Sequence, residues 1–223
     1  MQRPAAWLQN DDEQQTLDPL QVIPSLDEED NEKDKDEKPA FSPIEKELLD
    51  DRTILVNGPV DDKMSAGLTA RLLVLEKRDP KGLITLWINS PGGSADSGFA
   101  MYDMLKFIAC PIRTIVSGLC ASAGILIALG GDAKQRFSMP GSRFMLHQPS
   151  TAGQGQASDL DITAKEIVKM RARYVQIVAQ SSGKDEKDVV NDLSRDFWLS
   201  PVEAKEYGMI AKIIEKRTDL PKK

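Results

Sequence analysis

Residues 112–129, IRTIVSGLCASAGILIAL, constrain the fold more than any other stretch of the chain. A β-branched run, residues 112–116, gives way at Ser117 and Gly118 to small residues and then to a second apolar run. This pattern predicts a strand, a tight turn and a buried helix. Ser122 would then lie where the helix begins, so unpaired backbone N–H groups and the positive helix end could stabilise an oxyanion beside it. The same position also suits a serine that only caps the helix.

The chain contains one histidine, His147, in a second strand-like segment, residues 142–149. One histidine cannot build a His-rich zinc site, and Cys110 and Cys120 lack the C-x-x-C spacing, so we expect no metal. A nucleophilic serine needs a base, and the base needs a third group that holds its tautomer. Only His147 can supply an imidazole base for Ser122.

Charge is distributed unevenly along the 223 residues. Residues 1–38 carry twelve Asp/Glu and four Lys/Arg, a net charge of −8, which leaves +2 for residues 39–223 because the whole chain carries −6. Residues 27–38 have no apolar side chain and are expected to be disordered, since burial cannot offset their ordering entropy. A nearly neutral body gives no reason to expect nucleic acid as a ligand.

The sequence also indicates the compartment. Apolar runs stay shorter than about 18 residues, and the N-terminus lacks an apolar signal core, so we expect no membrane span and a reducing, cytoplasmic location. In that setting the two cysteines are most simply small buried apolar residues.

Hydrophobic periodicity predicts the order of the elements. We expect helices at 44–49, 64–78, 98–108, 158–181 (capped by Ser158), 186–193 and 200–208, and strands at 53–56, 83–88, 112–116, 137–139, 143–146 and 209–214. Repeated strand-to-helix crossovers favour parallel pairing and a layered α/β fold. Active sites of such folds collect at the C-terminal ends of strands, so Gly92, Gly93 and Ser122 should be neighbours.

Other motifs leave alternatives open. Cys120 could act as the nucleophile with His147 as its base. Residues 181–184 satisfy the S-x-x-K pattern of penicillin-interacting serine enzymes, although they lie at a helix exit and not at a helix start. Residues 89–97 could cradle a phosphate, but the P-loop spacing is absent.

Several segments together resemble a known family. These are Gly118–Gly124, Met145–Pro149, Asn89–Gly93, Gln154–Ala157, Arg195–Asp196 and Ala204–Gly208. In this order and spacing they resemble ClpP, the proteolytic subunit of the Clp protease, over residues 44–214. The resemblance divides the chain into an acidic extension (1–43), a peptidase domain (44–214) and a frayed tail (215–223).

The resemblance implies roles for individual residues. Ser122 would be the nucleophile, His147 the general base and Asp196 the group that orients His147. The remaining residues of the implied site are Gly93 and Ala123, whose backbone N–H groups form the oxyanion hole, and Gly92, Gln148, Pro149 and Gln154, which contact substrate. No cofactor is implied in this subunit, because ATP is used by the partner unfoldase.

The resemblance also implies an architecture and partners. It implies a ClpP/crotonase-like α/β fold of repeated strand–helix units, with residues 158–181 as a protruding handle helix. Two stacked heptameric rings of one chain, or rings mixed with a paralogue, would enclose a chamber that receives unfolded proteins and peptides. Family members begin with an apolar hairpin that contacts an AAA+ unfoldase. Here an acidic tail replaces it, and Ser194 replaces a frequent acidic residue, which leaves unfoldase docking and ring-to-ring pairing through Arg195 open.

Three functions are therefore compared. The leading one is a serine endopeptidase working inside an oligomeric chamber. The second is a non-catalytic subunit that co-assembles with an active paralogue, motivated by the altered N-terminus. The third, an acyl-CoA enzyme of the related crotonase fold, would need acidic catalytic residues in place of the Ser, His, Asp set.

Overall fold

The computed structural model describes residues 42–150 and 154–221. The acidic extension predicted for residues 1–43 lies outside the described residues up to position 41, and its disorder stays a prediction. The description begins at Ser42, which caps α1 (Pro43–Asp50) by accepting a hydrogen bond from the Glu45 N–H.

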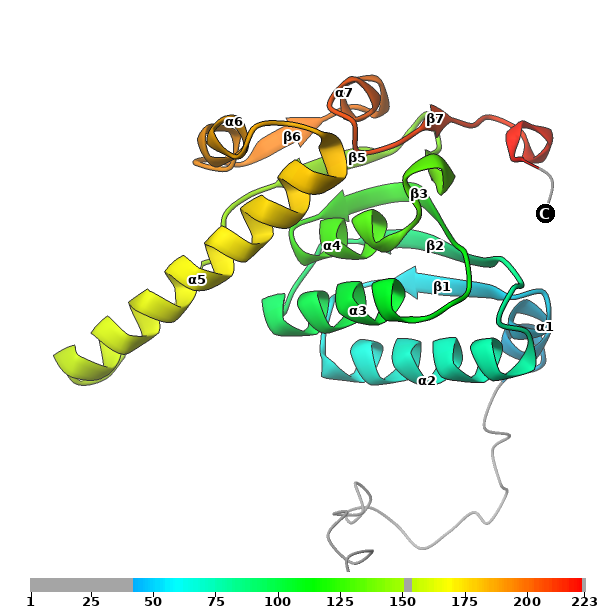
Figure 1. The fold of residues 1–223 in the computed structure, drawn as a ribbon, viewed down its shortest axis with the longest axis horizontal. Helices are drawn as coiled ribbons and strands as arrows, with labels where there is room; N and C mark the ends of the chain where they lie inside the picture. Colours follow the sequence, from blue (N-terminus) through cyan, green and yellow to red (C-terminus); the bar gives the residue numbers. More distant parts are fainter. Residues whose placement is uncertain (1–41, 151–153, 222–223) are drawn as a thin grey trace, which may run out of the picture. The chain divides into compact units, whose positions relative to one another are not determined.

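Helices and strands alternate from α1 to β4, and β5, α5, α6, β6, α7 and β7 follow (Figure 1). The helices after α1 are α2 (Asp62–Arg78), α3 (Ala95–Phe107), α4 (Ala123–Gly130), α5 (Ala157–Ser182), α6 (Glu186–Asp192) and α7 (Pro201–Glu206). The strands are β1 (Thr53–Asn57), β2 (Ile84–Ser90), β3 (Ile112–Ala121), β4 (Arg136–Ser138), β5 (Arg143–Leu146), β6 (Phe197–Leu199) and β7 (Lys212–Ile213). The predicted α/β fold of repeated strand–helix units is confirmed.

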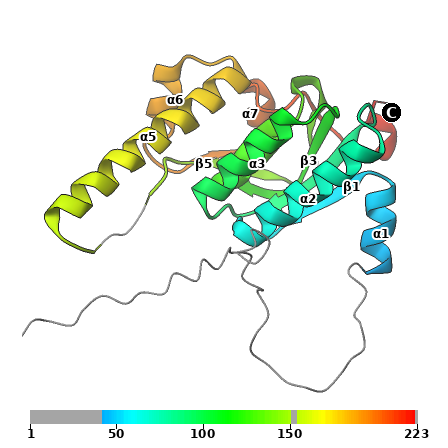
Figure 2. The same cartoon turned by 60° about the horizontal axis from the view of Figure 1, so that its bottom comes forward.

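The sheet explains why one of its faces carries the helices. Its strands run in the order β1-β2-β3-β4-β7, all parallel, while β5 pairs with the end of β3 and β6 pairs antiparallel with β5. Consecutive parallel neighbours joined by right-handed crossovers place their connecting helices on the same face. Figures 1 and 2 both show α2 and α3 side by side along the strands.

Side chains along each strand alternate between the face of the sheet that carries the helices and the opposite face. Ile54 and Val56 of β1 are buried, whereas Leu55 between them is 52% exposed. The helix α4 is buried along its whole length and carries no charged residue, which is expected of a helix surrounded by protein. The core therefore lies between the strands and α2–α4, and Ser122 immediately precedes its central helix.

The predicted turn at Ser117 and Gly118 is wrong, because β3 continues through both residues to Ala121. Gly118 adopts φ +113°, and the register between β2 and β3 shifts nearby. The side chain of Asn89 accepts a hydrogen bond from the Leu119 N–H at 3.0 Å, which supports the irregular strand from its neighbour. The turn into α4 consequently falls at Ser122 itself.

Two helices begin earlier than periodicity predicted. Asp61 caps α2 by accepting from the Met64 N–H, and Ser94 caps α3 by accepting from the Ser97 N–H. Apolar periodicity marks the buried face of a helix, whereas the first turn is fixed by its cap.

The long helix α5 leaves the body of the protein along its first half in both cartoon views. Its predicted cap, Ser158, is wrong: Gln156 occupies the N-cap position and makes no side-chain capping bond. The predicted end is confirmed by Gly183, which adopts φ +76°. Within the described parts of the chain, no helix is long and apolar enough to cross a membrane.

The C-terminal segment also differs from prediction. The last strand is shorter than the expected 209–214, because the Met209 N–H bonds to the Ala204 carbonyl and holds the chain in a turn. The tail predicted to be frayed, residues 215–223, is described as far as Pro221. A 3-10 turn forms at Arg217–Asp219, and the Pro221 carbonyl accepts a hydrogen bond from buried Arg113 at 3.0 Å.

Candidate active site

Ser122 lies at the junction of β3 and α4 in a strained conformation. Its φ of +53° is rare for a residue other than glycine, and its backbone is held by a 2.9 Å hydrogen bond from the Ser122 N–H to the Met145 carbonyl. Ser122 occupies the N-cap position of α4, yet its side chain makes no capping hydrogen bond. The alternative that Ser122 merely caps the helix is therefore wrong, and its hydroxyl is available for other contacts.

That hydroxyl contacts the single histidine. The Oγ of Ser122 lies 2.7 Å from Nε2 of His147, a hydrogen-bond distance. Strand pairing explains the approach, because Ala121 at the end of β3 is in register with Met145 of β5. Ser122 follows Ala121 directly, and His147 comes two positions after Met145. The pairing of the two strands therefore brings Ser122 and His147 together, although they are 25 positions apart in the chain.

Asp196 lies on the other side of the imidazole. Its Oδ1 is 3.8 Å from Nδ1 of His147, which is within ion-pair distance but too long for a hydrogen bond. Asp196 immediately precedes β6, whose Phe197 pairs with Leu146 of β5. Its side chain is 64% exposed, compared with 29% for His147. The structure therefore brings the three predicted residues into one row, in which the contact between His147 and Asp196 is the looser of the two.

The glycine-rich turn after β2 packs directly against Ser122. Gly92 adopts φ +87°, and a Cβ built on it would lie 2.6 Å from both the Ser122 Cβ and the Ala121 carbonyl oxygen. Only glycine fits such a close approach. The prediction from strand ends, that Gly92 and Ser122 should be neighbours, is confirmed.

Gly93 and Ala123, the two residues expected to form the oxyanion hole, line the same cavity as Ser122. Gly93 forms a parallel bridge with Val60, in which the Val60 N–H donates to Gly92 and the Ser94 N–H donates to Val60. Such a bridge uses the groups that flank Gly93, so the N–H and C=O of Gly93 itself point to the opposite side. Ala123 is the first residue of α4, and its N–H has no partner within the helix.

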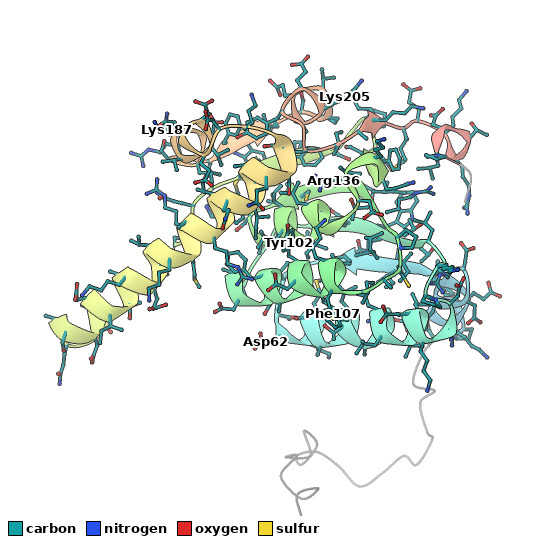
Figure 3. All side chains as sticks on the ribbon, in the orientation of Figure 1. Asp62, Tyr102, Phe107, Arg136, Lys187 and Lys205 are labelled. Atoms are coloured by element: carbon teal, nitrogen blue, oxygen red, sulfur yellow. The ribbon has the colours of Figure 1, made fainter. Side chains whose placement is uncertain are left out.

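A hydrogen-bond network supports this turn from behind. The buried hydroxyl of Ser97 donates to Asp62 at 2.6 Å and lies 3.1 Å from the Ser94 hydroxyl. Asp62, labelled in Figure 3, is the first residue of α2, whereas Ser97 lies in the first turn of α3. The network joins the two helix N-termini that flank Gly93.

A cavity of about 410 Å³ opens beside Ser122 and His147. Apolar side chains form most of its wall, and these are Pro91, Ala95, Ala123, Leu126, Met145, Pro149, Ile167, Met170 and Tyr174. The contribution of α5 to this wall was not predicted from the sequence. The spacing of Ile167, Met170 and Tyr174 marks one face of α5, which was the available signal.

Tyr174 also supports the nucleophile. Its hydroxyl donates to the Ser122 carbonyl at 3.2 Å, and burial raises the pKa of the phenol, which keeps the proton needed for this bond.

The other residues expected to contact substrate are placed differently. Pro149 and Gly93 line the cavity, whereas Gly92 lies behind Ser122. The Gln148 N–H donates to the Leu193 carbonyl at 3.3 Å, and the Gln148 side chain is not part of the cavity wall. Gln154 is exposed and also lies outside that wall.

The alternative sites do not assemble. Cys120 is fully buried, and burial raises the pKa of its thiol far above its usual range, which leaves no thiolate to act as a nucleophile. Cys110 and Cys120 are both free and buried, as expected of small apolar residues. Lys184 of the S-x-x-K motif lies over the Tyr207 ring at 4.9 Å. Across residues 42–150 and 154–221, no cluster of three His, Cys, Asp or Glu residues could hold a metal ion.

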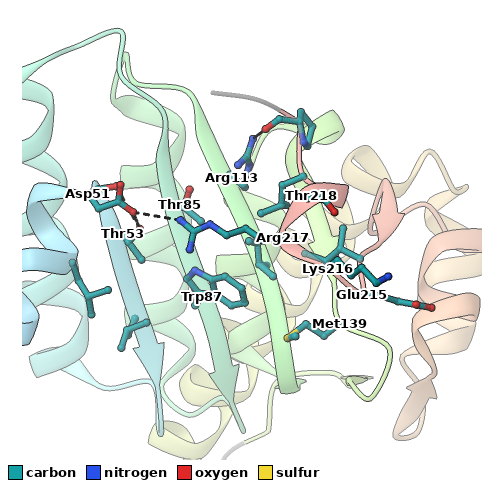
Figure 4. A pocket seen from close by; sticks show the side chains of 16 residues that line it. Asp51, Thr53, Thr85, Trp87, Arg113, Met139, Glu215, Lys216, Arg217 and Thr218 are labelled. Carbon is teal, nitrogen blue, oxygen red and sulfur yellow. Dashed lines mark hydrogen bonds and ion pairs between the residues drawn. The ribbon is translucent and has the colours of Figure 1, made fainter.

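A larger cavity of about 950 Å³ lies on the face of the sheet that α2–α4 leave uncovered (Figure 4). Its wall includes Thr85, Trp87 and Arg113, and an ion pair of 3.9 Å joins Asp51 to Arg217 at its edge. It shares no lining residue with the cavity beside Ser122. Size alone would therefore select the wrong cavity as the active site.

Comparisons with known proteins agree with this geometry. The sequence profile of the Clp protease family matches residues 35–217. An ATP-dependent Clp protease proteolytic subunit 2 from Treponema denticola is 39% identical over 195 residues, which cover 87% of this chain and 98% of the relative. The solved structure of a ClpP1 point mutant from Listeria monocytogenes superposes with a TM-score of 0.74 at 38% identity, covering 80% of this chain and 99% of the mutant.

Proposed function

The chain belongs to the Clp protease family and is therefore a serine peptidase, and we propose that it cleaves peptide bonds with Ser122 as its nucleophile. The observation that carries this proposal is the 2.7 Å contact between Ser122 Oγ and His147 Nε2 at a strained strand-to-helix junction. A serine that only stabilised the helix would turn its hydroxyl toward the helix backbone.

The first chemical step follows from this contact. His147 accepts the Ser122 proton as the oxygen attacks the peptide carbonyl, and it then donates that proton to the leaving amine. Water repeats the sequence on the acyl-enzyme and releases the second product. His147 must be neutral to start the cycle, and its Nδ1 then carries the proton that faces Asp196.

Asp196 is proposed to orient His147. Its carboxylate lies 3.8 Å from Nδ1 and is largely exposed, which supports a positioning role more than a tightly held ion pair. Catalytic hydrogen bonds are often long without substrate and shorten in the reacting complex.

The oxyanion is proposed to bind the N–H groups of Gly93 and Ala123. Both N–H groups belong to backbone that is already fixed, by the Val60 bridge and by the start of α4 respectively. Donors that are fixed in advance stabilise developing charge without reorganisation, and losing one typically costs about 10²–10³-fold in kcat.

An extended peptide fits beside these groups. While the Gly93 N–H binds the oxyanion, its outward C=O can accept a hydrogen bond from the substrate backbone, and one substrate side chain would enter the cavity. Pro149 would contact that side chain, whereas Gln148 and Gln154 are proposed to contact the peptide farther from the cavity. No cofactor is needed for this chemistry.

Assembly is proposed to follow the family pattern of two stacked heptameric rings, either of this chain alone or mixed with a paralogue, in the cytoplasm. The projecting part of α5 exposes Leu160, Ile162 and Val168, a surface that supports self-association. Unfolded proteins would reach the chamber through an ATP-driven AAA+ unfoldase. The acidic extension, residues 1–43, is proposed to affect such partners and not the hydrolysis itself.

Replacing the nucleophile tests the proposal. The variant Ser122→Ala should fold and assemble but lose peptide hydrolysis by about 10⁴ to 10⁶-fold, together with labelling by a fluorophosphonate. Ser158→Ala is the matched control, because Ser158 is exposed on α5 and makes no capping bond. Labelling that persists in Ser122→Ala, on Cys120 or on any other residue, would show that the nucleophile is assigned wrongly.

A further inference from the structure

We propose that Asp96 makes this site accept a long basic side chain, at the residue before the cleaved bond, better than a neutral side chain of the same shape. The proposal rests on the function assigned to Ser122, because it concerns which side chain the adjacent cavity accepts. Asp96 is a specificity residue in this proposal and takes no part in the chemistry.

The composition of the cavity wall is the first observation. Pro91, Leu126, Met145, Pro149, Ile167 and Met170 make the wall largely apolar, and Asp96 is the one residue of that wall with a permanently charged group at neutral pH. His147 also faces the cavity, but catalysis requires it to be neutral. The field that a substrate side chain meets in this cavity is therefore set mainly by one carboxylate.

The second observation is that this carboxylate has no partner among the residues that the structure describes. Among residues 42–150 and 154–221, no hydrogen bond or ion pair joins the Asp96 side chain to another group, and the residue is exposed. The nearby acid on the same helix, Asp103, is instead paired with Arg173 of α5. Asp96 thus remains free to pair with a charge that a substrate brings.

The third observation is the position of Asp96 relative to Gly93. Asp96 lies in the first turn of α3, three residues after Gly93, the proposed oxyanion donor whose C=O can also accept from the substrate backbone. Leu126, Ile167 and Met170 lie along the same cavity. A lysine or arginine side chain suits both features, because its methylene stem covers apolar surface while its charged end stays hydrated beside a carboxylate. An acidic side chain would be repelled.

The expected preference is modest. An exposed pair of opposite charges typically changes an equilibrium by up to about fivefold, and at low salt we expect a factor near that upper value between a charged and a neutral side chain of the same shape. Raising the ionic strength should reduce this factor, because salt screens exposed charges beyond a Debye length of about 8 Å at physiological ionic strength.

The test compares arginine with citrulline, which has nearly the same shape and no charge. Two peptidyl diphenyl phosphonates that differ only at this residue react covalently with an active serine, so their second-order labelling rates report recognition at Ser122. For the full-length protein we expect the arginine probe to react about fivefold faster than the citrulline probe at low salt.

Three variants separate charge from shape. Asp96→Asn should bring the ratio of the two rates close to one, and Asp96→Glu should restore the preference. Glu47→Gln removes an exposed charge on α1, away from the cavity, and should leave the ratio as in the unmodified protein.

The outcomes are distinct. An arginine-to-citrulline ratio at or below one in the unmodified protein overturns the proposal even where a variant fails to fold, and so does a ratio that Asp96→Asn leaves unchanged. Either result, with labelling that still disappears in Ser122→Ala, refutes only the role of Asp96. Labelling that survives Ser122→Ala refutes the proposed function itself.

Discussion

The substitution Gly92→Ala adds one methyl group at the point where the glycine turn meets the nucleophile. The new Cβ would lie 2.6 Å from the Ser122 Cβ, 2.6 Å from the Ala121 carbonyl oxygen and 2.9 Å from the Ala123 nitrogen. Two of these three atoms belong to backbone, so no flexible side chain can move away. Ordinary contacts begin at 3.4 Å, and Ser122 would therefore have to move by about 0.8 Å.

Two separate penalties follow. Gly92 adopts φ +87°, and an L-residue with positive φ costs roughly 1–2 kcal/mol, which should lower the free energy of unfolding by that amount or more. A displacement of the nucleophile by nearly an ångström costs on the order of 10²-fold in rate, because attack depends on alignment with both His147 and the oxyanion donors. The rate of peptide hydrolysis should therefore fall by about 10²-fold even at temperatures at which the variant is still folded.

The assay measures kcat/KM for a short peptide together with the midpoint of thermal unfolding. Gly141→Ala is the matched control, since a Cβ there meets nothing within 4 Å and its φ is not positive, and it should leave both quantities nearly unchanged. A Gly92→Ala protein that hydrolyses peptide at the normal rate would refute the view that this turn sets the position of Ser122.

Three further predictions can be checked on the same protein. Peptide hydrolysis should fall on acidification, because protonated His147 cannot accept the Ser122 proton, and His147→Ala should be inactive at every pH; a pH–rate profile checks both. Ser97→Ala removes the 2.6 Å bond to Asp62 and should lower kcat several-fold with little change in KM, since it loosens the Gly93 turn without touching substrate; steady-state kinetics would contradict this by showing an effect on KM alone. Deleting residues 1–38 should leave short-peptide hydrolysis within about twofold, because the acidic run 27–38 has no burial capacity, while unfoldase-dependent degradation or co-assembly changes. Loss of rings or of peptide hydrolysis after this deletion would show that the segment belongs to the core.

Much of the fold could be predicted from local patterns. The alternation of β-branched runs with helical periodicity predicts the element order, and the rule that sites collect at strand ends predicts that Gly92 lies beside Ser122. The end of β3 could not be found in this way. Its continuation past Gly118 depends on the Asn89 side chain, which contacts the Leu119 N–H from 30 positions away in the chain.

Other failures have the same long-range origin. The C-terminal segment looked frayed because its own residues are polar, whereas the structure gives it a 3-10 turn and a hydrogen bond from distant Arg113 to the Pro221 carbonyl. Ile167, Met170 and Tyr174 of the cavity wall were missed because α5 brings them from outside the repeated strand–helix units. Sequence patterns describe what a segment prefers, and these features are decided by the partner that a segment meets.

Strand pairing fixes the positions of Ser122 and His147 more firmly than that of Asp196, and the strand order explains why. Ser122 follows β3, which lies between neighbours on both sides, and His147 follows β5, which pairs with β3 and with β6. Asp196 precedes β6, whose pairing among the described residues is with β5 alone. A strand of three residues with one neighbour fixes its flanking side chains less firmly than an interior strand does. The contact of 2.7 Å therefore forms between the inner strands, whereas the contact of 3.8 Å lies at the edge. Any rearrangement that shortens the Asp196 contact has to come from movement of β6 toward His147, since Ser122 and His147 are already in place.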